Sequence, residues 1–350
     1  MDGCYCHALV VKAMSRVLSG TRVMCFGEAL IDMLSNKVNG DATTKHETFT
    51  QFAGGAPANV SVALAKLGGN SYFCGMLGRD AFGDFLQHSL LEYGVKTDYV
   101  LRTDKAKTAL AFVSLDQQGE RTFSFYRPPA ADLCFSQNDF QAQWFEQTAI
   151  FHFCSNSLTE SGIQEATQAG ITLAKQHRAL VSFDVNLRQN LWSQQGDPFG
   201  VIWSVMSGVD VLKVSREELE FLCAKQTQEQ TIARLLHCGC QLILISDGCR
   251  PLQWITANMQ GEIEPPQVSM VDATAAGDAF VGGLLFKLQE FFDRKGDLET
   301  LLSHASQLSD ILRFACACGA HAASIYGAFP SLPSLSSLDA LTREIHDDIT

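Results

Sequence analysis

The stretch from residue 271 to residue 278 has residue types and spacing that could do chemistry on a bound phosphate. It follows a predicted strand (residues 267–270) and opens a predicted helix. Small residues at such a turn let the backbone approach a ligand closely, and the amides and dipole at a helix start attract anions. Asp278 lies in the first turn, where the same field favours its ionised form. Beside a bound phosphate, this carboxylate makes chemical sense as a base for an attacking hydroxyl.

A structural interpretation of the same loop stays open. An acidic residue near a helix start stabilises the helix through its dipole, and the small residues could serve close packing alone. The loop is not a Walker motif, because no Gly-Lys-Ser/Thr follows it. A strand-linked Gly-x-Gly-x-x-Gly fingerprint is also missing near the start of the chain, which disfavours a dinucleotide-dependent dehydrogenase.

The elements that must position this loop alternate between short apolar strands and helices, which predicts a parallel sheet covered on both faces and an α/β fold. A helix over residues 57–67 has proline at its start and glycine just after its end, and a second helix covers residues 80–93. The predicted strands span residues 23–29, 72–76, 149–153, 180–183, 209–214 and 242–246.

One region departs from this alternation. Residues 109–115 and 122–126 are strand-like and are joined by the turn-forming stretch 116–120, which indicates a hairpin. A further strand over residues 48–52 would complete a small sheet, a lid drawn from about residues 45–53 and 108–127. No repeat or linker divides the chain, so we expect one domain over residues 23–340, after an N-terminal extension (1–22) without a structural role.

Composition limits the partners. The 350 residues carry a net charge of −12, with 46% hydrophobic and 18% charged residues. An acidic chain without a basic run disfavours nucleic acid and anionic membranes as partners, and no apolar stretch is long enough for a membrane span. The twelve cysteines lie largely inside apolar runs, which favours free thiols and a cytoplasmic location. Cys4, Cys6 and His7 lack the second ligand pair of a zinc site.

Two separate motifs carry a resemblance to a known family. Residues 272–278 (Asp-Ala-Thr-Ala-Ala-Gly-Asp) resemble the C-terminal signature of the ribokinase-like (PfkB) carbohydrate kinases, and residues 54–60 (Gly-Gly-Ala-Pro-Ala-Asn-Val) resemble their N-terminal signature. The similarity spans roughly residues 23–333. It implies a ribokinase-like three-layer α/β/α fold, with a mostly parallel central sheet and a small β-sheet lid. Residues 125–132 and 183–188 look most like fructokinases, and aminoimidazole riboside kinases share several of these stretches.

The resemblance implies the catalytic roles. Asp278 would take the proton from a primary hydroxyl of the sugar, and the amides of Ala275, Ala276 and Gly277 would form an anion hole for the transferred γ-phosphate. Phosphoryl transfer of this kind depends on positioning and electrostatics, with little covalent chemistry for the protein to perform.

Asp32, Gly54, Gly55 and Asn59 match the sugar-contacting positions of the family. A carboxylate can accept hydrogen bonds from two adjacent hydroxyls, and an amide can both donate and accept. A strand-end aspartate and an ordinary helix-start turn are the structural alternative. Arg127 could close over the sugar from the lid, although an arginine in a hairpin is as often only solvated.

On the nucleotide side the resemblance implies contacts with ATP. The residues concerned are Asn186, Arg188, Ser246, Gly248 and Gly319. The structural alternatives are a turn for the residues that follow the predicted strands, and ordinary helix packing for the small residues of the segment 311–324.

Cation sites are implied at two places. Glu218 would organise hydrated Mg²⁺, although Ser215 to Glu218 also forms the pattern of a helix capping box. Asp272 and Thr274 match positions that hold a monovalent cation in relatives, which makes K⁺ a candidate ion.

Four residues depart from the family pattern. Ala275 replaces glycine, Ala273 replaces threonine, and Ser215 replaces asparagine, as in many fructokinase-like members. Cys316 stands where relatives commonly have asparagine, which questions the nucleotide contacts there. None of the four removes the base.

The function predicted from the sequence is phosphorylation of D-fructose to D-fructose 6-phosphate with ATP. An aminoimidazole riboside kinase, a ribokinase and a 2-keto-3-deoxygluconate kinase are the alternatives among enzymes, and a catalytically silent sugar-binding regulator is the alternative among non-enzymes. The edge strands of the lid could pair across two subunits, so a homodimer through the lid is a further expectation.

Overall fold

The computed structural model describes residues 20–39, 46–115, 121–127, 129–192 and 196–347. Its main sheet has nine strands in the order β13-β12-β11-β10-β9-β8-β1-β4-β5. Neighbouring strands are parallel except for β11–β12 and β12–β13, which confirms the mostly parallel α/β fold. The strands are β1 (Arg22–Phe26), β4 (Ser71–Gly78), β5 (Lys96–Thr103), β8 (Thr148–Cys154), β9 (Leu180–Asp184), β10 (Val211–Ser215), β11 (Leu242–Asp247), β12 (Arg250–Ile255) and β13 (Gln260–Ile263).

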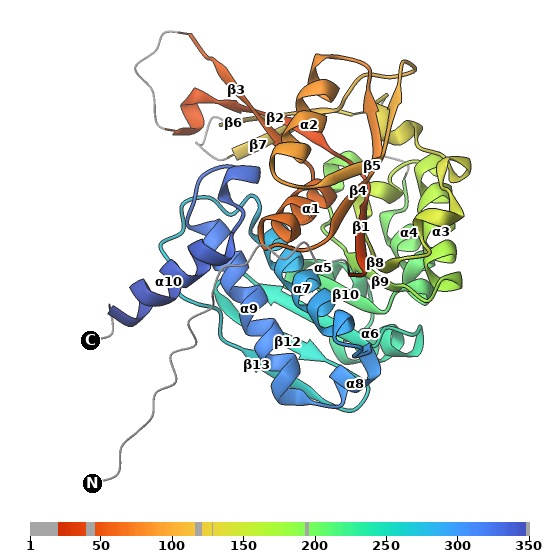
Figure 1. The fold of residues 1–350 in the computed structure, drawn as a ribbon, viewed down its shortest axis with the longest axis vertical. Coiled ribbons are helices and arrows are strands. Elements are labelled where there is room, and N and C mark those ends of the chain that lie inside the picture. Colours follow the sequence, from red (N-terminus) through yellow and green to blue (C-terminus); the bar gives the residue numbers. More distant parts are fainter. Residues whose placement is uncertain (1–19, 40–45, 116–120, 128, 193–195, 348–350) are drawn as a thin grey trace.

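Helices cover both faces of this sheet (Figure 1). Because side chains alternate along a strand, Val23 and Cys25 of β1 join one core, whereas Met24 and Phe26 join another. The first face carries α1 (Ala56–Lys66), α2 (Ala81–Glu92), α7 (Ala276–Asp293), α8 (Leu298–Leu302) and α9 (Ala305–Ala323), with α10 (Leu335–Asp347) packed on α9. The second face carries α3 (Ser161–Gln176), α4 (Pro198–Val205), α5 (Arg216–Cys223) and α6 (Gln228–His237).

A second, four-stranded sheet projects from the main layer, at the top of Figure 1. We call it the lid; its order is β3-β2-β6-β7, with β2 (Leu30–Ser35), β3 (Phe49–Gly54), β6 (Leu110–Leu115) and β7 (Arg121–Tyr126). The predicted lid is thereby confirmed, but the sequence did not assign β2 to it. The chain leaves the main sheet after Phe26 and enters the lid at Leu30. The predicted turn 116–120 lies outside the described residues.

Other predictions differ from the structure in detail. Strands β5, β12 and β13 were not predicted, and residues 267–270 form no strand. The N-terminal extension was expected to have no structural role, yet Arg22 begins β1 and Thr21 donates its amide to Asp293 Oδ1 at 2.9 Å. Residues 1–19, including Cys4, Cys6 and His7, lie outside the described residues. At the other end, α10 continues past the predicted boundary at residue 340.

Ten cysteines lie in the described part of the chain, and all ten are free thiols. Of the helices that the structure describes, none combines the length and the apolar character needed to cross a membrane.

Candidate active site

The predicted site residues gather at the carboxyl ends of the parallel strands, where ligands bind in open α/β sheets. Asp184 ends β9, Ser215 ends β10 and Asp247 ends β11. The first turn of α7 faces this edge from one side, and the lid lies beside it. Strand order therefore brings together residues that are almost 250 positions apart in the sequence, from Asp32 to Asp278.

Asp278 is buried and is oriented by two amide side chains. Asn59 Nδ2, from the first turn of α1, donates to Asp278 Oδ2 at 2.7 Å, and Asn186 Nδ2 donates to Oδ1 at 3.3 Å. Asn186 has a φ of 38°, a left-handed conformation that asparagine tolerates better than most residues. Two hydrogen bonds from different elements fix the direction in which the carboxylate points.

The protonation of Asp278 differs from the expectation. Its position at a helix start was expected to favour the ionised form, but burial raises the pKa of Asp278 to about 7. The hydrogen bond from Asn59 lowers this pKa and the nearby Asp184 raises it further. Desolvation of the charged form therefore outweighs the helix field. A carboxylate with a pKa near neutrality is suited to accept a proton.

The predicted anion hole forms the start of α7. Ala275 is the N-cap residue with φ −111° and ψ 11°, so this position tolerates alanine in place of glycine. Ala276 and Gly277 face an adjacent cavity, whereas Ala275 is buried. The amide of Ala276 donates to Ala273 O at 3.2 Å. Amides in the first turn lack an intrahelical acceptor, so Gly277 presents its N–H group at the helix end.

At the junction of the lid and α1, Leu30 of β2 pairs with Gly54 of β3 and Asp32 pairs with Phe52, so the Asp32 side chain lies diagonally across from Gly54. A Cβ atom on Gly54 would overlap the carboxylate of Asp32, and one on Gly55 would lie 2.6 Å from Glu28 O. Gly55 also has a φ of 103°. Burial raises the pKa of Asp32 to about 7, against the lowering effect of Arg188. The glycines are therefore required by close approach and backbone conformation.

Arg127 is not the exposed lid residue that the hairpin position suggested. Its side chain is 2% exposed and pairs with Asp132 at 2.7 Å. The same guanidinium donates to Asn156 O at 2.8 Å and to Thr159 Oγ1 at 3.1 Å. These contacts tie the end of lid strand β7 to the main layer, so a contact with a sugar would require one of them to open.

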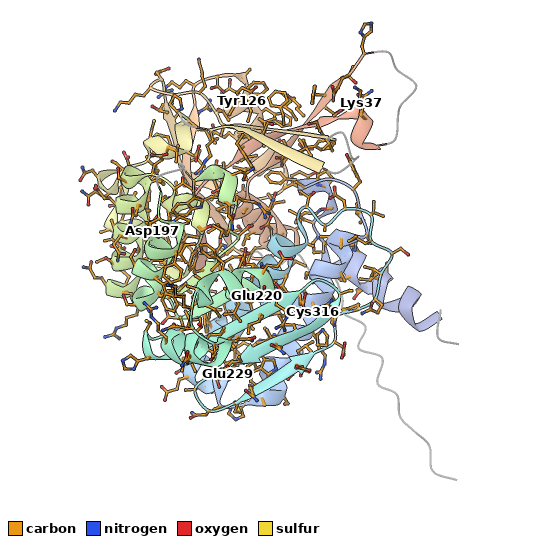
Figure 2. All side chains as sticks on the ribbon, turned by 180° about the vertical axis from the view of Figure 1, so that it is seen from behind. Lys37, Tyr126, Asp197, Glu220, Glu229 and Cys316 are labelled. Carbon is orange, nitrogen blue, oxygen red and sulfur yellow. The ribbon has the colours of Figure 1, made fainter. Side chains whose placement is uncertain are left out.

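One of two cavities at this edge, which we call the apolar cavity, has a volume of about 220 Å³. Ser246 of β11 and Gly248 of the β11–β12 turn line it on one side, and Cys316 and Gly319 of α9 also line it. Figure 2 shows Cys316 of α9 well separated from Tyr126 of the lid. Apolar side chains of the helices and of the loop after β13 form much of the remaining walls, including Pro265, Val268, Met270 and Phe280. The charged residues Lys213, Asp247 and Arg250 also line this cavity. Such a cavity suits a flat, largely apolar group.

The second cavity, which we call the polar cavity, has a volume of about 540 Å³. The predicted residues Asn186, Arg188, Glu218, Thr274 and Asp278 all line it. Glu218 has both carboxylate oxygens engaged, accepting from Leu187 N at 2.8 Å and from Ser215 N at 2.7 Å. Glu218 therefore forms the capping box of α5 and also lines the polar cavity.

The fit to cations differs between the two predicted sites. In the described residues, no three His, Cys, Asp or Glu side chains are arranged to hold a metal directly. Contact between Glu218 and Mg²⁺ through water stays a prediction. Asp272 Oδ1 accepts from Thr274 N at 3.0 Å and Oδ2 accepts from Gly327 N at 3.2 Å, so this carboxylate shapes the loop before α7.

Sequence reasoning missed two groups here. Lys213 of β10 forms an ion pair with Asp184 at 3.0 Å, and both side chains are buried. A lysine inside an otherwise apolar central strand was the signal that could have identified it. Glu28 is the other group: it accepts from Asn156 Nδ2 at 2.9 Å and from Ala56 N at 3.3 Å, which ties the β1–β2 turn to the start of α1.

Comparisons with known proteins show the family of the chain. Residues 20–335 match the model of the pfkB family carbohydrate kinases. Fructokinase-2 of Solanum habrochaites is 37% identical over 331 residues, which cover 94% of this chain and 98% of that protein. A crystal structure of fructokinase with bound ATP from Xylella fastidiosa is 45% identical, with a TM-score of 0.87, 92% of this chain covered and 98% of that one.

Aminoimidazole riboside kinase from Salmonella enterica, complexed with aminoimidazole riboside and an ATP analog, is 31% identical, with a TM-score of 0.79, 92% of this chain covered and 99% of that one. The family match spans most of the chain. The chain belongs to the pfkB family of carbohydrate kinases.

Proposed function

We propose that this carbohydrate kinase transfers the γ-phosphoryl group of ATP to the primary hydroxyl of D-fructose, giving D-fructose 6-phosphate, with Asp278 as the base. The observation that carries the proposal is the position of Asp278. Asn59 and Asn186 orient its carboxylate. Asp278 lies in the first turn of α7, and its side chain lines the polar cavity. A hydroxyl placed there would meet a proton acceptor with a pKa near neutrality.

The two cavities suggest how ATP would lie. The apolar cavity would take the adenine ring, with Ser246, Gly248 and Gly319 around the nucleoside. The polar cavity would take the phosphates, with Asn186 and Arg188 in reach of their oxygens. The amides of Ala275, Ala276 and Gly277 would then stabilise charge on the transferred group. Cys316 offers an apolar contact where relatives commonly have an asparagine.

Sugar binding is proposed at the lid junction. Asp32 would accept hydrogen bonds from two hydroxyls, and Gly54 and Gly55 would let the backbone approach the ring. Asn59 would bridge the sugar and Asp278. Arg127 would contribute mainly by holding the lid in place, because its guanidinium already binds Asp132 and two groups of the main layer.

Cations are assigned by the same reasoning. Glu218 would hold Mg²⁺ through water, and the ion would supply positive charge to the phosphate oxygens. Asp272 and Thr274 would hold K⁺ if the loop before α7 binds a monovalent ion.

Fructose is favoured over other sugars by the relatives. The Xylella fastidiosa fructokinase is 45% identical, whereas the Salmonella enterica riboside kinase is 31% identical. Ribose and 2-keto-3-deoxygluconate remain alternatives on the same chemistry. A catalytically silent sugar-binding regulator is disfavoured, because both Asp278 and the glycine of the anion hole are present.

The test is ADP release from ATP and Mg²⁺ across a sugar panel. The panel contains fructose, ribose, glucose, 2-keto-3-deoxygluconate, fructose 6-phosphate and aminoimidazole riboside. Strong turnover with fructose alone is expected. A different preferred sugar would contradict the substrate and keep the kinase chemistry, whereas sugar binding without any turnover would support the silent regulator.

The lid also bears on assembly. Its order leaves β3 and β7 at the edges of the four-stranded sheet, and unpaired edges favour pairing with another strand. We expect a homodimer through the lid. A monomeric mass by light scattering at the working concentration would contradict it.

A further inference from the structure

Lys213 lies between the two cavities of the site. Three residues line both of them, namely Lys213, Ala273 and Gly277. Lys213 is the only one of these three with a charged side chain. A ligand that extends from the apolar cavity into the polar cavity has to pass this ammonium group.

The pairing of Lys213 holds it rigidly. Lys213 and Asp184 are register partners on the neighbouring parallel strands β10 and β9, and their charged atoms are 3.0 Å apart. The lysine side chain is 10% exposed and the aspartate side chain 1%. Little conformational entropy remains to be lost when a ligand arrives, so the cation is positioned in advance.

The surroundings of the ammonium group indicate an anion. A Cβ atom on Gly277 would lie 3.3 Å from Lys213 Nζ, so the ammonium group lies against the first turn of α7. A cation at a helix N-terminus is unfavourable, because that end carries a positive partial charge. Asp184 offsets part of the lysine charge, but the ammonium group of Lys213 and the positive end of α7 still face the same space. A phosphate group between them would be attracted by both.

We propose that Lys213 is a catalytic residue that contacts the γ-phosphoryl group of the nucleotide and stabilises the charge on it during transfer, with Asp184 as its positioning residue. This inference deepens the proposed function and depends on a nucleotide lying across the two cavities. Burial disfavours the charged lysine, but Asp184 and Glu218 outweigh this effect and raise the pKa of Lys213. The residue therefore acts as a permanent cation.

The reaction step balances without a proton from Lys213. A bond forms between the sugar hydroxyl oxygen and the γ-phosphorus, and the bond from that phosphorus to the oxygen bridging to the β-phosphate breaks. The bridging oxygen leaves with the electron pair on ADP, and the hydroxyl proton goes to Asp278. Lys213, which lines both cavities, attracts the oxygens of the phosphoryl group during its transfer.

The experiment compares Lys213→Met with the wild-type enzyme in two assays. In the first, kcat for sugar phosphorylation is expected to fall about 100-fold or more, while the KM for the sugar changes less than about threefold. In the second, calorimetry measures binding of ADP and of an ATP analogue with a methylene group between the β- and γ-phosphorus. The affinity for the analogue is expected to fall about tenfold, and that for ADP less than about threefold. Lys213→Arg should recover part of both losses.

Two further variants separate a contact with phosphate from neutralisation of Asp184. Lys213→Met leaves a buried carboxylate unpaired and could reduce folding, so Lys213→Met/Asp184→Asn removes both charges together. The double variant is expected to stay as slow as the single one. Wild-type kcat in the double variant, or equal losses of affinity for ADP and for the analogue, would overturn the proposal.

The matched control is Lys175→Met, which removes a lysine from another ion pair with aspartate, Lys175–Asp210 at 2.6 Å, that also borders a cavity. It should leave kcat and the ratio of the two affinities within about twofold. The calorimetric assay needs no turnover. If the wild-type enzyme phosphorylates no sugar, the proposed function fails, and the two affinities still support or overturn the role of Lys213.

Discussion

Two lysine–aspartate pairs lie at opposite ends of strand β10. Asp210 comes just before the strand and binds Lys175 at 2.6 Å, and its carboxylate also accepts from Val181 N at 2.8 Å and from Gln241 Nε2 at 3.0 Å. Lys213 lies near the end of the strand and binds Asp184. In the described part of the chain, the Asp184 carboxylate accepts a hydrogen bond from that lysine alone.

The difference is that the protein satisfies the carboxylate fully at one end of the strand and only partly at the other. The amide and side-chain donors around Asp210 satisfy a carboxylate and fix the end of the strand. At the other end, burial raises the pKa of Asp184 to about 6 and the pKa of Asp278 to about 7. Carboxylates that the protein satisfies incompletely remain available to a ligand.

The largest effect that tests this comparison is expected for Asp278→Asn. The amide keeps the shape but cannot accept the hydroxyl proton, so kcat should fall about 1000-fold, with ATP affinity largely unchanged in calorimetry. Asp210→Asn is the matched change at the other end and should keep kcat within about twofold. Near-normal turnover of Asp278→Asn would exclude Asp278 as the base.

The pH dependence of the wild-type enzyme should show the raised pKa values directly. The base works only when ionised, so kcat/KM should rise with pH, by about tenfold per unit below pH 7, and level off above it. The measurement is initial rate from pH 5.5 to 8.5 at constant ionic strength. A profile that is flat over this range would contradict the ionisation assigned to Asp278, and the residual activity of Asp278→Asn should lack the rise.

Gly277→Ala should give a smaller loss of kcat, without a loss of stability. Alanine stabilises a helix relative to glycine by about 1 kcal/mol, yet its Cβ would lie 3.3 Å from Lys213 Nζ. We therefore expect kcat to fall about tenfold, while the melting temperature does not decrease. Gly162→Ala is the matched control, because Gly162 lies in the first turn of α3 and a Cβ there meets no atom within 4 Å. Unchanged kcat in Gly277→Ala would show that the helix start tolerates a side chain.

The sequence predicted the fold well where periodicity and motifs were strong. The apolar strands β8, β9 and β11 and the helices α1 and α2 were predicted within a few residues of their bounds. Strand β2 was missed because residues 23–29 were assigned to one strand, although Gly27 and Glu28 interrupt the apolar run where the chain passes from the main sheet into the lid. Strand β13 (Gln-Gly-Glu-Ile) contains a single apolar side chain and so lacks the apolar alternation that predicts a strand.

The motifs predicted residues that lie together in the structure, but they did not predict the electrostatics around Asp278. The motifs identified Asp278, Asn59 and Asn186 as site residues. In the structure, both asparagines donate hydrogen bonds to Asp278. Their spacing could not reveal that burial would outweigh the helix field at Asp278. Neither could it reveal that Arg127 is buried in an ion pair, since the partner and the depth of a side chain depend on packing between distant elements.

The smallest expected effect concerns the free energy of unfolding. Asp278→Asn and Asp210→Asn, which lie at opposite edges of the main sheet, should change it in opposite directions at pH 8. A raised carboxyl pKa means that the folded protein binds a proton more readily than the unfolded chain. The folded state is therefore destabilised as pH rises through the interval between the unfolded value, near 4, and the folded value, about 7. Asp278→Asn removes this effect, so its free energy of unfolding relative to wild type should increase by about 2 kcal/mol between pH 5.5 and pH 8.

Asp210→Asn should instead destabilise the protein by about 1–2 kcal/mol at both pH values, because it loses the pair with Lys175 and weakens the bond to Val181 N. Urea unfolding at the two pH values measures both changes. If Asp278→Asn destabilised the protein as Asp210→Asn does, the carboxylate of Asp278 would be structural. A gain in stability at pH 8 would mean that the chain keeps this buried acid at an energetic cost, which a role in chemistry explains and a role in folding does not.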